Sequence, residues 1–329
     1  MPPKRVFVTQ KIPEIGIKLL QKYFQVKVYL KDQAMPKKEL IKEVKKCDAL
    51  LCLLTDKIDA EIINANPKLK IISNYAVGFD NIDTNAATKK MIPVTNTPGV
   101  STDAVAEHTF ALILAVTKHI VEADSFTKAG KYNGWKPMQF LGSELKGKTI
   151  GIVGLGRIGA GVAERAGKGM GVKVLYYDIK RNKDFEKEYR AAFVSLPTLF
   201  KKSDFVSIHV PLLPSTRHLI GKTELSMMKK SAYLINTSRG PIVDEKALVQ
   251  ALKKKQIAGA ALDVYEHEPK LTPGLTKLKN VVLTPHTASA TIEARTAMSE
   301  LAAQNIIDVL QGRKAKFTVN PEVYGKKRK

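Results

Sequence analysis

Short apolar runs alternate with amphipathic segments over residues 5–95. Each run has the length and the β-branched content of a strand buried in a parallel sheet. The segments 15–24 and 37–46 carry apolar residues at helical spacing, and Pro36 suits the first turn of a helix. Crossovers of this length predict parallel strands connected with a right-handed sense. The predicted strands are 6–9, 26–30, 49–54, 71–74 and 92–95.

A second series of apolar runs begins at residue 148, again separated by helical patterns. Six strands with intervening helices are typical of a doubly wound sheet. Before this series, residues 101–129 form one long apolar-rich helical pattern, whose start Asp103 can cap. A last helix, near 291–310, has no strand left to join in this sheet, so we expect the chain to return to the first domain. The predicted strands are 149–153, 172–177, 204–208, 232–236, 257–262 and 281–283.

A glycine-rich turn follows the first strand of this second series, in the sequence KTIGIVGLGRIG at 148–159. Gly154, Gly156 and Gly159 form the pattern G-x-G-x-x-G. The first glycine permits a tight turn, the second lets backbone approach a pyrophosphate, and the third lets helix pack on strand. The pyrophosphate would lie at the positive end of the helix that opens near Arg157. The pattern predicts a dinucleotide site.

An acidic residue follows at the expected distance. Asp178 ends the next apolar run, about 20 residues after the last glycine, where an acid binds the adenosine ribose hydroxyls. Its charge favours NAD and would repel the 2′-phosphate of NADP, although Lys180 and Arg181 could soften that discrimination. An ordinary βαβ unit with a surface aspartate is the alternative, but strand, glycines, helix and acid occur in the order that the dinucleotide motif requires.

The length of 329 residues suits two domains, each with its own core. No apolar run reaches the roughly 18 residues that a membrane span needs, and the N-terminus leads into a strand without the apolar core of a signal peptide. We therefore expect a soluble, cytoplasmic protein. Cys47 and Cys52 lie in an apolar context and match no metal-ligand spacing, so no disulfide framework and no metal site is expected.

The formal net charge of +23 would suit a nucleic acid or a membrane surface as partner. The lysines, however, are spread over predicted helix faces such as 37–46 and 253–255, without the interleaved aromatic residues that a single-strand-binding surface needs. A solvated, lysine-rich surface is the favoured interpretation, with neither nucleic acid nor membrane as partner. The only true basic cluster is KKRK at 326–329, which we interpret as a disordered end.

Reactive side chains follow three strands of the second series, in the segments 236–240, 263–269 and 284–290. The carboxyl ends of parallel strands face the ligand crevice of such a sheet, so the Arg, Glu and His of these segments form a candidate constellation for reducing a carbonyl beside a carboxylate. In the first domain, the loop 74–80 follows the fourth strand, and its Gly78 would let backbone N–H groups face an anion. A plain turn is nearly as good an explanation of that loop.

These segments, together with 74–83, the glycine turn and His209-Val-Pro211, resemble the D-isomer-specific 2-hydroxyacid dehydrogenase family over essentially the whole chain. Within it they are most similar to the glyoxylate and hydroxypyruvate reductases. The resemblance implies an α/β fold of two doubly wound parallel-sheet domains: a Rossmann NAD-binding domain at 99–290, inserted in a discontinuous, flavodoxin-like substrate domain at 1–98 and 291–329. It also implies a homodimer built around the long helix 101–129.

The same resemblance implies the roles of particular residues. Arg239, Glu268 and His286 would be catalytic, and the N–H groups of Val77 and Gly78 would hold the substrate carboxylate. Trp135 matches a loop that, in glyoxylate reductases, reaches the site of the neighbouring subunit. Cofactor contacts are expected from Thr102, Gly154, Gly156, Arg157, Ile158, Gly159, Asp178, Val210, Pro211, Thr216, Thr237, Ser238, Asp263 and Ala288.

The chemistry of reduction agrees with these roles. A protonated His286 can neutralise the charge that grows on the carbonyl oxygen, and a carboxylate at Glu268 would favour the imidazolium. Arg239 can make forked contacts to a 2-oxo acid that lysine would not reproduce. His267 is the alternative acid. Thr287 and Ala288 stand where relatives often have a larger apolar residue and glycine, which would alter the nicotinamide side of the pocket.

The sequence thus predicts reduction of small 2-oxo acids, glyoxylate and hydroxypyruvate, with NADH preferred over NADPH. D-lactate or D-3-phosphoglycerate dehydrogenase activity is the alternative within the family. However, Glu-His-Glu-Pro at 266–269 differs from the usual D-lactate dehydrogenase pattern, and the extra regulatory domain of many phosphoglycerate dehydrogenases is missing. Glu268 argues against formate dehydrogenase. A non-catalytic, NAD-sensing protein like the corepressors of this scaffold is a rival from another class.

Overall fold

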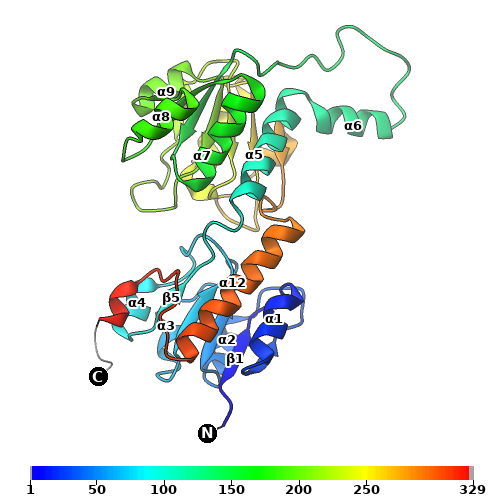
Figure 1. The fold of residues 1–329 in the computed structure, drawn as a ribbon. Helices are drawn as coiled ribbons and strands as arrows, with labels where there is room; N and C mark the ends of the chain where they lie inside the picture. The colour runs from blue at the N-terminus through cyan, green and yellow to red at the C-terminus, as the bar shows by residue number, and fades with distance from the viewer. Residues whose placement is uncertain (1, 326–329) are drawn as a thin grey trace. The chain divides into compact units, whose positions relative to one another are not determined.

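The computed structural model describes residues 2–325, which form two compact units. The first comprises the described residues up to Ser101 together with those from Ala290 onward, and the second is Thr102–Ser289. Each unit is organised around a parallel β-sheet with helices on both faces (Figure 1). An α/β fold of two doubly wound sheets is therefore confirmed.

The sheet of the first unit has the order β2-β1-β3-β4-β5, with every neighbouring pair parallel. This is the flavodoxin-like order. β3 and β4 lie at its centre and are buried along their whole length, as expected of apolar runs covered on both faces. The strands are β1 (Arg5–Val8), β2 (Gln25–Val28), β3 (Ala49–Cys52), β4 (Ile71–Asn74) and β5 (Val94–Thr95).

Alternating side chains of these strands build a core on each face of the sheet. On one face Val6 and Leu51 pack with α1 (Glu14–Gln21) and α12 (Ile292–Leu310). On the other, Phe7 and Leu50 pack with α2 (Lys37–Val44), α3 (Ala60–Asn64) and α4 (Thr84–Lys89). The short helices α3 and α4 were not predicted from the sequence.

The C-terminal helix α12 is an integral part of the first unit. Ser73 of β4 donates its hydroxyl hydrogen to the Ala302 carbonyl at 3.0 Å, and Ser299 donates to the Pro13 carbonyl at 2.7 Å. Gly16 permits the close approach of α1, because a Cβ there would lie 2.4 Å from the Ser299 carbonyl oxygen. The chain ends its described part with the short helix η4 (Pro321–Tyr324).

The sheet of the second unit has the order β12-β11-β10-β9-β6-β7-β8, again parallel throughout. The order reverses between β6 and β9, which is the switch point where such sheets bind ligands. The two-residue edge strand β8 was not predicted. The strands are β6 (Thr149–Val153), β7 (Lys173–Tyr177), β8 (Ala192–Phe193), β9 (Phe205–Ile208), β10 (Tyr233–Asn236), β11 (Gly259–Leu262) and β12 (Val281–Leu283).

Helices cover this second sheet on both faces. One face packs against α5 (Thr102–Thr117), α7 (Arg157–Glu164) and α8 (Lys183–Tyr189), and α7 continues as a turn of π-helix, η1 (Arg165–Gly169). The other face packs against α9 (Leu196–Lys202), α10 (Lys222–Met227) and α11 (Glu245–Lys253). The short helices η2 (Gly240–Ile242) and η3 (Leu275–Lys277) lie in loops.

The prediction of a single long helix at 101–129 is wrong. The segment forms α5 and α6 (Ile120–Lys128), which meet at a bend of 64°. His119 has a left-handed backbone at φ 54°. The Ser143 N–H donates a hydrogen bond to the Thr117 carbonyl at 3.0 Å. Gly142 approaches this carbonyl so closely that a Cβ would lie 2.2 Å from it. The returning chain therefore ends α5 where hydropathy alone predicts continuation.

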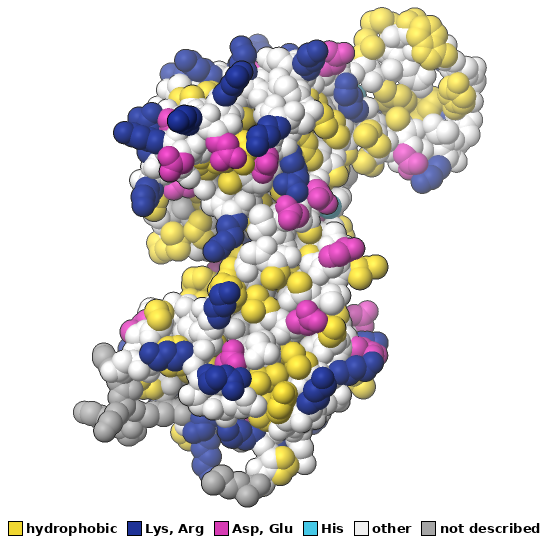
Figure 2. Space-filling model, in the orientation of Figure 1, with side chains coloured by type: hydrophobic (Ala, Val, Ile, Leu, Met, Phe, Trp, Pro, Cys, Tyr) yellow, Lys and Arg dark blue, Asp and Glu magenta, His cyan; other side chains and the backbone are white. Residues whose placement is uncertain are grey.

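Charged side chains are mixed on the face shown in Figure 2, where Lys and Arg are distributed over both units with Asp and Glu between them. The basic segment 326–329 lies outside the described residues. Within the described chain, no single helix is long and apolar enough to cross a membrane. The bent pair of α5 and α6 reaches the length and apolar content of a membrane span only when the two helices are taken together. Many residues of α5 are buried in the protein core.

Candidate active site

The candidate chemistry of the second unit gathers at the carboxyl edge of its sheet. Because the strands are parallel, the loops that follow β6, β9, β10, β11 and β12 all begin at this edge. The loops carry Gly154 after β6, Val210 and Pro211 after β9, Thr237 to Arg239 after β10, Asp263 and Glu268 after β11, and His286 and Ala288 after β12.

The glycine turn has the geometry that a pyrophosphate requires. Gly154 adopts φ +96°, and a Cβ there would lie 2.8 Å from the His209 carbonyl oxygen. A Cβ at Gly159 would lie 2.1 Å from the Gly154 carbonyl oxygen, so only glycine allows α7 to pack here. A Cβ at Gly156 would meet nothing within 4 Å, and no side chain caps α7 at this residue. The open backbone at the helix N-terminus fits a dinucleotide phosphate.

Asp178 lies beside this turn, at the end of β7. Its carboxylate accepts a hydrogen bond from the Leu155 N–H at 2.6 Å and from the Lys180 N–H at 3.3 Å. The turn and the end of β7 are thus tied together. A carboxylate held in this position can accept hydrogen bonds from ribose hydroxyls, as the dinucleotide motif requires.

Arg239 lies on a loop that two neighbours fix. Asn236 folds the loop back on itself, since its amide donates to the Arg239 carbonyl at 2.9 Å and accepts from the Ser238 N–H at 3.0 Å. Gly240 packs directly on the backbone of Tyr265, where a Cβ would lie 1.8 Å from the carbonyl carbon. The Arg239 loop therefore rests against the loop that carries Glu268.

Glu268 and His286 are in direct contact, with 2.9 Å between Glu268 Oε2 and His286 Nδ1. The other carboxylate oxygen accepts from the Tyr265 N–H at 2.9 Å, so the carboxylate is held at two points. Burial raises the pKa of Glu268, but the hydrogen bond and charge of His286, the hydrogen bond from the Tyr265 N–H and the charge of Arg239 together outweigh burial, and the pKa lies below its ordinary value. Glu268 is therefore ionised at neutral pH, and Nε2 of His286 points away from this contact.

His286 has a strained backbone, with φ +55°. Such a conformation costs of order 1–3 kcal/mol and persists only where the surroundings impose it. Here the surroundings are Asp263, whose carbonyl accepts from the His286 N–H at 2.8 Å and whose carboxylate accepts from the N–H groups of Thr287 and Ala288, each at 2.8 Å. Asp263 thus fixes the backbone that carries the histidine.

The Asp263 carboxylate is itself completely buried. It also accepts from the Thr284 hydroxyl at 2.6 Å, and His108 of α5 lies 3.5 Å from it. Burial raises the pKa of Asp263, but the hydrogen bonds from His108, Thr284 and the two backbone N–H groups outweigh burial and lower the pKa overall. His108 and Thr284 were not predicted as partners, because contacts among α5 and the loops after β11 and β12 leave no local pattern in the sequence.

A second cluster that the sequence did not reveal anchors the loop before Glu268. The buried Glu245, at the start of α11, accepts from the Glu266 N–H at 2.8 Å and from the Thr272 hydroxyl at 2.6 Å. Glu266 in turn lies 2.7 Å from Nε2 of His218. Burial raises the pKa of Glu245. An acid in the first turn of a helix also stabilises the helix dipole, so the sequence does not mark Glu245 as a buried anchor.

Other histidines of the second unit have different surroundings. Burial lowers the pKa of His209 to about 3, so this side chain is neutral. His267, the alternative acid, is largely exposed, and its Nε2 lies 3.9 Å from Glu266 rather than beside Glu268. His119, which precedes α6, pairs with Glu122 of that helix at 2.7 Å.

Several predicted cofactor contacts already have protein partners. The Thr237 hydroxyl bonds to that of Thr109 at 2.9 Å, and the Thr216 hydroxyl donates to the Pro211 carbonyl at 2.6 Å. Ser238 donates to the Val210 carbonyl, which joins the loops after β9 and β10. Thr102 is the first residue of α5, and Arg157 and Ile158 open α7. These bonds give the crevice wall a fixed shape.

In the first unit, the loop after β4 is fixed by two asparagines. Asn74 donates to the Gly78 carbonyl at 2.8 Å, and Asn96 donates to the Val77 carbonyl at 2.7 Å. In a planar trans peptide the N–H points opposite to the carbonyl. The Gly78 N–H therefore points away from Asn96, and the half-exposed loop can offer it to an anion.

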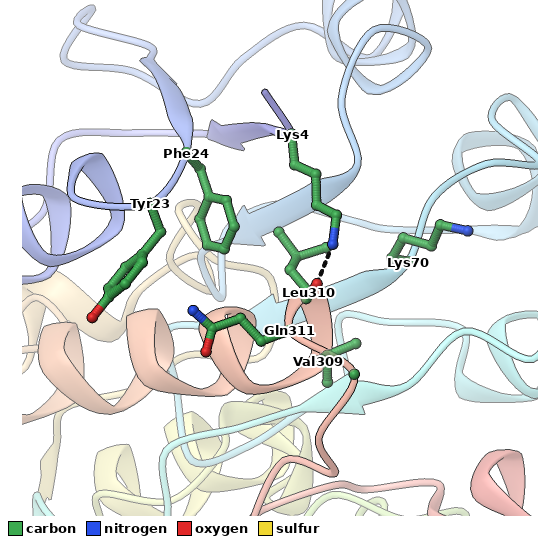
Figure 3. Close-up of a pocket in the computed structure, with 8 residues that line it drawn as sticks. Lys4, Tyr23, Phe24, Lys70, Val309, Leu310 and Gln311 are labelled. Atoms are coloured by element: carbon green, nitrogen blue, oxygen red, sulfur yellow. Dashed lines mark hydrogen bonds between the residues drawn. The ribbon is translucent and has the colours of Figure 1, made fainter. Parts of the chain in front are cut away.

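A cavity of about 730 Å³ lies elsewhere in the first unit, beside the C-terminal end of α12. Lys4 and Lys70, which border it, precede β1 and β4, so the cavity lies at the amino edge of the sheet and not at the carboxyl edge. Lys4 donates to the Leu310 carbonyl (Figure 3). A cation at a helix C-terminus stabilises the helix. This contact gives the Lys4 side chain a structural role at the end of α12.

Trp135 lies in the segment that follows α6 and is 82% exposed. No residue of α6 is buried. Figure 1 shows α6 and this segment extending away from the sheet of the second unit, and Figure 2 shows apolar side chains gathered there. The exposed apolar residues of this arm are Ile120, Val121, Tyr132, Trp135, Met138 and Leu141.

Comparisons with known proteins agree with this geometry. Residues 110–288 match the family described as D-isomer specific 2-hydroxyacid dehydrogenase, NAD binding domain. The chain is 56% identical to a glyoxylate reductase of Thermofilum pendens over 97% of this chain and 95% of the relative. It is 52% identical to a glyoxylate reductase of Thermococcus litoralis over 98% of each. The TT0316 protein of Thermus thermophilus, a solved structure, is 40% identical and superposes with a TM-score of 0.90 over 96% of this chain and 99% of that one.

The chain therefore belongs to the D-isomer specific 2-hydroxyacid dehydrogenase family. The predicted resemblance is confirmed, and so is NAD as the cofactor of the second unit.

Proposed function

We propose that this protein is an NADH-dependent reductase of glyoxylate and hydroxypyruvate. The observation that carries the proposal is the Glu268–His286 pair at the carboxyl edge of a dinucleotide-binding sheet. The names of the curated relatives, glyoxylate reductases at 52% and 56% identity, support the choice of substrate. Hydroxypyruvate is the same 2-oxo acid with a hydroxymethyl group in place of hydrogen.

His286 acts as the proton donor. NADH, when bound, supplies the hydride that reaches the carbonyl carbon of the substrate. Negative charge then grows on the carbonyl oxygen, and the imidazolium of His286 gives this oxygen its Nε2 proton. Glu268 holds Nδ1 at 2.9 Å, which fixes the orientation of the ring.

Arg239 binds the substrate carboxylate and carbonyl through its forked donors. The loop from Asn236 to Gly240, which rests on Tyr265, restricts where the guanidinium can lie. In the first unit, the N–H groups of Val77 and Gly78 are proposed to take the substrate carboxylate. Asn96 holds the Val77 carbonyl and thereby orients the Gly78 N–H. The Thr97 N–H donates to the Ala76 carbonyl at 2.9 Å and thereby orients the Val77 N–H.

We propose further that the chain forms a homodimer through α6 and the segment after it. Exposed apolar side chains gathered on an extended arm are typical of a surface that another protein covers. Light scattering after size exclusion should give twice the chain mass of 36.3 kDa. Replacing Trp135 and Met138 by Ser should weaken the dimer, and a wild-type mass of one chain would contradict this part of the proposal.

A panel of 2-oxo acids tests the function. Purified protein should oxidise NADH with glyoxylate and hydroxypyruvate faster than with pyruvate or 3-phosphohydroxypyruvate, whose preference would instead indicate D-lactate or D-3-phosphoglycerate dehydrogenase activity. NADH binding without oxidation by any of these acids would contradict the reductase and favour an NAD-sensing protein.

We expect a cytoplasmic reductase, because NADH and 2-oxo acids are metabolites of that compartment.

A further inference from the structure

In dinucleotide-binding sheets, the choice between NAD and NADP can depend on a basic side chain near the acid that ends the second strand, here Asp178. NADP differs from NAD by a phosphate on the adenosine ribose, and enzymes that accept it commonly use an arginine near the end of this strand. Arg181 follows Asp178 closely in sequence and lies in the same loop, between β7 and α8. From sequence alone, Arg181 is available to that phosphate.

The structure gives Arg181 another partner. Its Nε donates to Oε1 of Glu186 at 2.8 Å, and its Nη2 donates to Oε2 at 2.7 Å. Two N–H groups of the guanidinium thus bind the two carboxylate oxygens in a forked contact, the strongest geometry for an arginine–carboxylate pair. The guanidinium also lies 5.9 Å from the centre of the Phe193 ring.

Glu186 is fixed in turn by the sheet. The hydroxyl of Tyr176, a completely buried residue of β7, donates to Oε1 of Glu186 at 2.8 Å and accepts from the Asn182 N–H at 2.8 Å. The hydrogen bond from Arg181, followed by that from Tyr176, lowers the pKa of Glu186 to about 2. The carboxylate is therefore charged at every pH at which a reductase would be assayed.

We propose that Glu186 is a specificity-determining residue, which holds Arg181 away from the 2′-phosphate subsite and so favours NADH over NADPH. Asp178 repels the phosphate directly, whereas Glu186 acts by withholding the arginine that would attract it. The inference rests on the NAD site of the second unit and does not require the proposed substrate.

Binding titrations test the inference without turnover. NADH and NADPH are titrated separately into wild type, Glu186→Gln and Glu186→Ala, and binding is followed by nucleotide fluorescence. Release of Arg181 should lower the Kd for NADPH about fivefold, equivalent to about 1 kcal/mol, with little change for NADH. The double variant Arg181→Gln/Glu186→Gln should lose this gain.

Glu188→Gln is the matched control. Glu188 lies on the same helix and its loss changes the net charge equally, but its carboxylate is near Lys168, at 3.8 Å. An equal gain for NADPH in Glu188→Gln, or a gain that persists without Arg181, would overturn the inference by showing a general charge effect. Wild-type protein that binds neither nucleotide would contradict the NAD site itself, a different result.

Discussion

Two of the carboxylate–histidine pairs in the second unit, Glu268–His286 and Asp263–His108, differ in what surrounds them. Glu268 and His286 are partly exposed, with 32% and 25% of their side chains accessible, and their atoms approach to 2.9 Å. Asp263 is completely buried and lies 3.5 Å from His108. Its carboxylate accepts its other hydrogen bonds from two backbone N–H groups and the Thr284 hydroxyl. The first pair can exchange a proton with a ligand, whereas the second fixes the loop that carries His286.

The largest effect is expected from the buried pair. Asp263→Ala leaves the N–H groups of Thr287 and Ala288 without an acceptor in a buried place, which should cost about 3 kcal/mol of unfolding free energy. Denaturant unfolding should show this loss together with a fall in kcat. Unchanged stability would mean that the loop does not depend on Asp263.

The same substitution has a pH signature. Because the folded pKa of Asp263 is lowered, its stabilisation is present above the ordinary aspartate pKa, near 3.9, and is lost as the pH falls through the folded pKa. The stability difference between wild type and Asp263→Ala should therefore shrink below about pH 4. A difference that is constant down to pH 2 would contradict the assigned charge.

Substitutions of Arg239 distinguish effects on substrate binding from effects on the chemical step. Arg239→Ala should raise KM as well as lower kcat, because in its proposed role the arginine contacts the substrate carboxylate in both ground and transition states. Arg239→Lys should recover only part of the activity, since one point charge replaces a planar fork. Full recovery by lysine would show that charge alone suffices.

Glu268→Gln keeps the shape of the exposed pair but removes its charge. The kcat for reduction should fall, because the ring of His286 loses the charged partner that holds its Nδ1 at 2.9 Å. Glu266→Gln, two residues earlier and paired with His218, is the control and should lower kcat less. An unchanged kcat in Glu268→Gln would direct attention to His267.

The smallest effect is expected from His108→Gln. His108 Nε2 lies 3.2 Å from the Thr284 hydroxyl, and glutamine can replace that contact. Stability should change by less than about 1 kcal/mol, and kcat by less than about threefold. A loss as large as that of Asp263→Ala would show that the Asp263 carboxylate depends on the histidine.

Much of the fold could be predicted because apolar runs report burial directly. β4 and β6 lie within a residue of their predicted places, since buried parallel strands are continuous apolar segments. The helix 101–129 could not be predicted correctly, because it ends through a contact between Thr117 and Ser143, which are distant in sequence. Short elements such as α3 and β8 have too few residues for a periodic signal.

The site divides in the same way. The glycine turn and Asp178 form a local pattern with a fixed spacing, and the structure gives them the geometry that the pattern requires. The partners of Asp263 and the pairing of Arg181 with Glu186 depend on tertiary packing, which no spacing encodes. Sequence therefore indicated which residues carry charge, but not which of them are already engaged.

The most direct test of the account is a single-turnover measurement with His286→Ala. Enzyme saturated with NADH is mixed with glyoxylate, and the loss of NADH absorbance is followed for wild type and variant. We expect NADH binding to be unchanged and the rate of the single turnover to fall about 10²- to 10⁴-fold, the usual contribution of a general acid. A variant that turns over as fast as wild type would contradict the role of His286 as proton donor.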